Sequence, residues 1–93
     1  MKRSDVEAAV AAVDHALRED ADHAYDDLAN AVRHVVRLRD GLIGEQRQGN
    51  GVGDRLGRVN AILSHLVGAE YPLEGIRRQR IEKVRDELKS LLP

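Results

Sequence analysis

Imidazole and carboxylate side chains, which bind divalent metal ions, are concentrated in the N-terminal third of the chain. Four of them follow one another at steps of four, three and four residues, the spacing of one helix face: His15, Glu19, Asp22 and Asp26. A metal centre in a helical bundle needs a second helix with matching Glu and His residues. The chain contains no Glu-x-x-His sequence and no Cys. We therefore predict a solvated acidic face without a metal ion.

A second pair of chemically competent residues lies in the segment 54–67, where six residues separate Arg58 from His65. This spacing resembles the Arg-x(4–6)-His signature of the helical HEPN ribonucleases. The resemblance implies that the Arg would hold the scissile phosphate and that the His would act as acid or base. Arg18 and His23 satisfy the same spacing, and neither pair has a surrounding motif. Our interpretation is that Arg58 and His65 are surface residues and that the protein is not an enzyme; a HEPN-like ribonuclease is an alternative.

The densest basic segment lies near the C-terminus and contains Arg77, Arg78, Arg80, Lys83 and Arg85. Such a segment could contact nucleic-acid phosphates, so a nucleic-acid-associated regulatory protein is another alternative function. Acidic residues three or four positions away permit ion pairs within the helix. The segment has no aromatic side chain for stacking on bases, and the net charge of the chain is −1. Nucleic acid is therefore not the partner that we predict.

Apolar residues recur at steps of three and four along most of the chain, which is the spacing of amphipathic helices. We predict helices over 5–41, 54–67 and 73–91, and a flexible Gly-rich loop over 44–53. The first helix would be about 55 Å long, well above the average length. If it breaks, the acidic run around Asp22 is the expected place.

These elements predict one all-α domain spanning residues 1–93. We expect a three-helix bundle with a long N-terminal helix and coiled-coil-like packing, or four helices if the first one breaks near Asp22. A chain of this size can form a single modest core. No apolar run approaches the roughly 18–20 residues of a membrane span, and no signal-peptide pattern follows Met1. We therefore expect a cytoplasmic protein without membrane contact.

The apolar stripes of the first segment exceed what so short a chain can cover alone, which predicts a partner. The predicted interface consists of Val6, Val10, Val13 and Leu17, followed by Val32 and Val36. Residues 1–30 contain eight acids and three bases (net −5), whereas residues 31–93 contain eight acids and twelve bases (net +4). Such a division favours charge-complementary packing. We predict a non-enzymatic protein–protein interaction module that forms a homodimer or binds another helical protein, with no catalytic residue and no cofactor.

Overall fold

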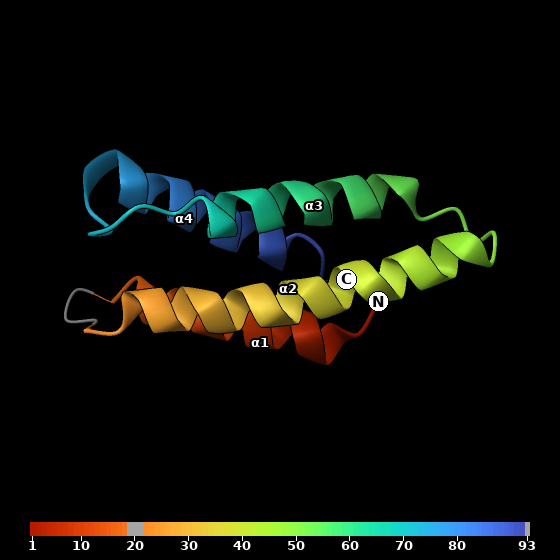
Figure 1. The fold of residues 1–93 in the computed structure, drawn as a ribbon, viewed down its shortest axis with the longest axis horizontal. Coiled ribbons are helices and arrows are strands. Elements are labelled where there is room, and N and C mark those ends of the chain that lie inside the picture. The colour runs from red at the N-terminus through yellow and green to blue at the C-terminus, as the bar shows by residue number, and fades with distance from the viewer. Residues whose placement is uncertain (19–21, 93) are drawn as a thin grey trace.

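The computed structural model describes residues 1–18 and 22–92, and every regular element in these ranges is a helix. The helices are α1 (Arg3–Ala16), α2 (Ala24–Arg47), α3 (Gly53–Val67) and α4 (Gly75–Lys89). They form an elongated bundle that measures 44 × 22 × 20 Å (Figure 1). None of the helices described is both long and apolar enough to cross a lipid bilayer.

The four helices pack as a ring. Helix α1 contacts α2 and α4, and α3 contacts the same two helices, so each helix has two neighbours. Figure 1 shows α1 and α2 in one layer and α3 and α4 in the other, with the α2–α3 connection at the right-hand end. Each side of the bundle is therefore formed by the outer surfaces of two neighbouring helices.

Apolar residues at helical spacing meet along the axis of this ring. In α1 the buried positions are Val6, Ala9, Val13 and Ala16, and in α4 they are Ile81, Val84 and Leu88. Buried alanines occur in α1 and α2, where a small side chain loses its solvent contact only if the neighbouring helix lies close. Among the residues described, no polar or charged side chain is buried. The core is thus a single aliphatic cluster.

The prediction of one continuous helix over 5–41 is wrong, and the four-helix alternative is right. Helix α1 ends at Ala16, and Asp22 lies in the turn before α2. The physical reason is that a single rod leaves its apolar edge in water, whereas the folded-back chain buries α1 against α2. Asp26 and Asp27 then occupy the first turn of α2, where negative charge interacts favourably with the helix dipole.

The connection between α2 and α3 is shorter than the predicted loop 44–53. Helix α2 continues to Arg47, and its last turn is closed by the backbone bond from Gln48 N–H to the Gly44 carbonyl. Helix α3 begins at Gly53. Gly49 and Gly51 have positive φ values of 81° and 62°, a conformation that favours glycine. The last helix also starts later and ends earlier than the predicted segment 73–91, at Gly75 and Lys89.

Candidate interaction surface

The N-terminal half of the predicted interface lies inside the bundle. Val6 and Val13 are fully buried and Leu17 is 4% exposed, and all three belong to the core shared by the helices. Val10 is half-buried and packs against the same core. A second copy cannot contact these side chains unless α1 leaves the bundle. In the single chain, the N-terminal stripe is therefore part of the bundle core and not of its outer surface.

Val32 and Val36 lie on the outer side of α2, although Val32 also packs against the core. Both are half-buried, whereas the α2 residues that point into the core are Leu28, Ala31, Val35, Leu38 and Leu42. The two valines belong to a second apolar row, which is offset from the core row and runs at steps of four, three and four residues, followed by a step of seven that passes Arg39 and Asp40. Its members are Tyr25, Ala29, Val32, Val36 and Ile43. Helix α2 is therefore apolar on the core side and also on an adjacent outer side.

Helix α3 continues this apolar surface across the gap between the two helices. Leu56 and Leu63 are half-buried, and Val67 is 69% exposed at the same helical spacing. A groove of about 340 Å³ separates α2 from the end of α3, and its walls include Val32 and Val67. We call this surface the outer α2–α3 face, and it consists of the five α2 residues above with Leu56, Leu63, Val67 and Tyr71.

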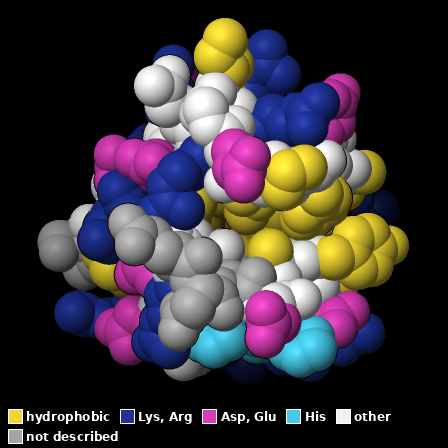
Figure 2. Space-filling model, turned by 90° about the vertical axis from the view of Figure 1, so that its left-hand side faces the viewer, with side chains coloured by type: hydrophobic (Ala, Val, Ile, Leu, Met, Phe, Trp, Pro, Cys, Tyr) yellow, Lys and Arg dark blue, Asp and Glu magenta, His cyan; other side chains and the backbone are white. Residues whose placement is uncertain are grey.

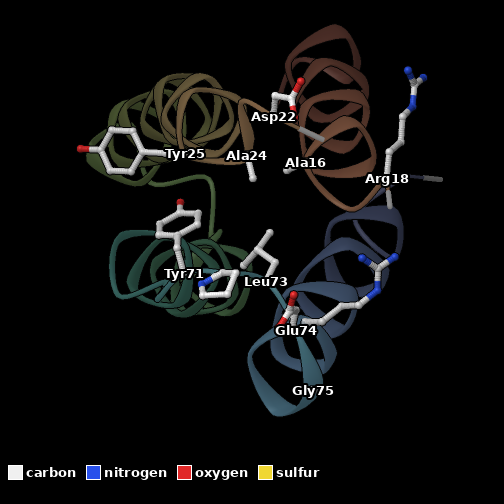
Figure 3. Close-up of a pocket in the computed structure, with 11 residues that line it drawn as sticks. Ala16, Arg18, Asp22, Ala24, Tyr25, Tyr71, Leu73, Glu74 and Gly75 are labelled. Carbon is white, nitrogen blue, oxygen red and sulfur yellow. The ribbon is translucent and has the colours of Figure 1, made fainter. Parts of the chain in front are cut away.

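The only two aromatic residues of the chain meet at one end of this face. Tyr25 lies in the first turn of α2 and Tyr71 follows α3, and their ring centroids lie 5.6 Å apart in a tilted arrangement. Figure 3 shows the two rings side by side at the outer edge of the bundle. Burial, and then the neighbouring Tyr25 phenol, raise the pKa of Tyr71 above its ordinary value. Figure 2 shows that hydrophobic side chains gather on one side of this end of the molecule.

The α3 side of the face is poor in charge. Residues 59–69 form the longest stretch of the chain without Asp, Glu, Lys or Arg. The exposed positions along the outward side of α3 carry small or uncharged side chains, namely Gly57, Asn60, Ala61 and Ser64. A partner can therefore approach this helix closely without removing water from charged groups, which would cost free energy.

The predicted basic cluster does not form one patch, because its members lie on different sides of α4. Arg78 pairs with Glu82 at 3.1 Å. Arg85 reaches Asp14 of α1 at 3.7 Å. Arg77 is turned toward the end of α3 and pairs with Glu70 at 3.5 Å. Arg80 and Lys83 are exposed. Three of the five basic side chains are thus paired with carboxylates.

The structure also separates Arg58 from His65. The Arg58 guanidinium donates a hydrogen bond to the Ser90 hydroxyl near the end of α4. His65 Nδ1 lies 2.7 Å from the Ala61 carbonyl oxygen, so this nitrogen donates to its own helix. The pocket beside His65 contains Arg77 but not Arg58, and Arg58 lines another pocket with Arg55. The two residues therefore do not face one common cleft.

Histidines near the predicted acidic face contact carboxylates of α2 instead. His15 Nδ1 lies 2.5 Å from Asp27 Oδ2, which joins α1 to α2. His23 lies 3.8 Å from Asp26, and both side chains are largely exposed. Glu19 is outside the described residues. Within the described ranges, no group of three or more metal-ligating side chains comes together.

The sequence contained part of the signal for the outer α2–α3 face. The second row of α2 is visible in the spacing of Val32, Val36 and Ile43. Sequence analysis missed Tyr25, Val67 and Tyr71, because the pairing of two tyrosines 46 positions apart depends on the path of the chain. Comparisons with known protein families, with curated proteins and with solved structures found no match to this chain.

Proposed function

We propose that this protein is a non-enzymatic helical interaction module that forms a homodimer through its outer α2–α3 face. The observation that carries the proposal is the apolar row on the outside of α2. Three of the four large hydrophobic side chains that are exposed in the described structure, Tyr25, Val67 and Tyr71, also belong to this face. Exposed apolar side chains that cluster on one side of a small protein mark contact sites.

The dimensions of the bundle fit such an interface. One long side measures 44 Å by 20 Å, which gives about 900 Å² in projection, compared with about 800 Å² per partner in an interface of standard size. The half-buried side chains of α2 and the exposed side chains of α3 would lose their remaining water contact on this side. Burial of apolar area contributes about 25 cal/mol for each Å². This contribution can stabilise a dimer.

The positions of the other candidate residues support a non-enzymatic role. Arg58 and His65 line different pockets, and the arginines at positions 77, 78 and 85 are paired with carboxylates. Neither arrangement provides the convergent groups that catalysis or phosphate binding requires. A different helical protein that occupies the same face is an outcome of the test below.

The test compares two apolar side chains that are changed to the same acidic residue. Val36→Glu places a charge in the proposed interface, where an unpaired carboxylate is costly to bury. Ile76→Glu is the matched control, since Ile76 is 68% exposed on α4, outside the face. Light scattering should give twice the chain mass of 10.3 kDa for the native protein and for Ile76→Glu. Val36→Glu should remain helical by circular dichroism but have the monomer mass.

Two results would contradict the proposal. In the first, the native chain is a monomer at concentrations up to 1 mM, where even a weak dimer with a Kd in that range is populated. In the second, the native chain is a dimer and Val36→Glu dimerises equally well. A chain that is monomeric alone but binds another helical protein, with the same sensitivity to Val36→Glu, would replace the homodimer with a heterologous complex.

A further inference from the structure

A row of four charged residues borders the outer apolar row of α2. Its members are seven residues apart and alternate in sign: Asp26, Arg33, Asp40 and Arg47. Seven residues are close to two helical turns, so the four side chains lie on one line along the helix. All four are exposed. We call them the α2 charge row.

From this row we infer that two copies of the protein pair through α2 in antiparallel orientation. The inference rests on the proposed homodimer and adds its orientation and register. In a parallel pair, the charge rows of the two copies would lie at opposite edges of the seam, so their charges would not meet. In an antiparallel pair centred between residues 36 and 37, Asp26 lies opposite Arg47 of the second copy. Arg33 lies opposite Asp40 in the same way, so twofold symmetry gives four ion pairs and no like-charge contact.

The apolar row agrees with this register. Val36 lies next to the twofold axis, and Ile43 of one copy is brought toward Val32 of the other. This is the arrangement of an antiparallel coiled coil, in which apolar seam residues meet and flanking charges select the orientation. Arg39 lies in the same region, and its guanidinium is already paired with Asp40 at 3.2 Å.

The contacts that the row makes within one chain are weak enough to rearrange. Asp26 lies 3.8 Å from His23, and Arg33 donates a hydrogen bond to the Asn30 side chain at 3.1 Å. These contacts are local and exposed, and such pairs contribute little to stability. Replacing these local contacts by ion pairs with the second copy therefore costs little free energy.

Charge reversal tests the register. Arg33→Asp and Asp40→Arg each place two like-charge pairs in the antiparallel dimer, and each should raise the Kd about tenfold at low salt. The double variant Arg33→Asp/Asp40→Arg should return the Kd to the native value. A mixture of the two single variants should form heterodimers in preference to homodimers, since both contacts are then attractive. Lys83→Asp, which reverses an exposed charge on α4, is the matched control and should leave the Kd unchanged.

Cross-linking tests the orientation independently, because the chain has no Cys of its own. Val36→Cys places two thiols near the twofold axis, so a short bis-maleimide should join the two copies. Asp26→Cys places them roughly 30 Å apart in the antiparallel pair, so no cross-link should form. If both variants cross-link, the orientation is parallel and the inference is overturned.

The remaining outcomes separate this inference from the proposed function. If the native chain is a dimer and the reversals at positions 33 and 40 leave its Kd unchanged, the register is overturned. The proposed homodimer is then retained. A native dimer in which neither cysteine variant cross-links overturns α2–α2 pairing in the same way. A native chain that is monomeric overturns the proposed function, and the orientation with it.

Discussion

Replacing Val13 by Ala tests whether this side chain stabilises the core of a single chain or contacts a second copy of the protein. Val13 is fully buried in the core, on a helix that packs against α2 and α4. The substitution removes two methyl groups and leaves a cavity that the aliphatic neighbours fill only in part. At about 0.8 kcal/mol for each buried carbon, with a further contribution from the cavity, we expect a loss of about 2–3 kcal/mol in the free energy of unfolding.

The assay is urea unfolding monitored by circular dichroism at a protein concentration below the dimer Kd. For a domain of this size the same loss lowers the Tm by roughly 10–20 °C. Ala11→Ser is the control, because Ala11 is exposed on the same helix and its replacement should cost about 0.5 kcal/mol or less. The dimer Kd of Val13→Ala, measured where the variant is folded, should equal that of the native chain. A large loss of dimerisation with unchanged monomer stability would refute the reasoning, since Val13 would then face a partner.

Three further substitutions test separate parts of the structure. Gly49→Ala should lower the free energy of unfolding by about 1 kcal/mol in urea melts, because φ is +81° at this position. The raised pKa of Tyr71 means that the folded state holds this proton more tightly than the unfolded state, so stability should fall as the pH rises above 10.0. Tyr71→Phe should reduce this fall more than Tyr25→Phe does, in melts recorded from pH 9 to 11. Asp14→Ala removes an exposed partner of Arg85 and should cost no more than about 1 kcal/mol in thermal melts.

The all-helical fold could be predicted because the aliphatic spacing is regular along most of the chain. The break after Ala16 was harder to predict, since no Gly or Pro marks it. Two residues show the consequence. Val13 and Val36 have the same side chain and belong to similar helical rows, yet Val13 is buried and Val36 lies on the outer surface. The position at which the chain turns back after α1 decides which apolar row is buried within one chain. Helical periodicity does not reveal the position of that turn.

For the basic cluster of α4, by contrast, the sequence alone shows that its members cannot all lie on one side of the helix. At 100° per residue, Arg78 and Arg85 lie on nearly the same side of a helix, whereas Arg80 lies about 160° away from Arg78. The structure places Arg85 against Asp14 of α1 and turns Arg77 toward Glu70. The separation into two groups was therefore predictable, but the carboxylates that pair with them across helices were not.

Sedimentation equilibrium of the native chain beside Val36→Glu tests most directly whether the outer α2–α3 face binds a second copy. We predict a concentration-dependent mass that rises from 10.3 kDa toward twice that value for the native chain, and a constant monomer mass for Val36→Glu. A native mass that stays at 10.3 kDa up to 1 mM, or the same association in both proteins, would contradict the account.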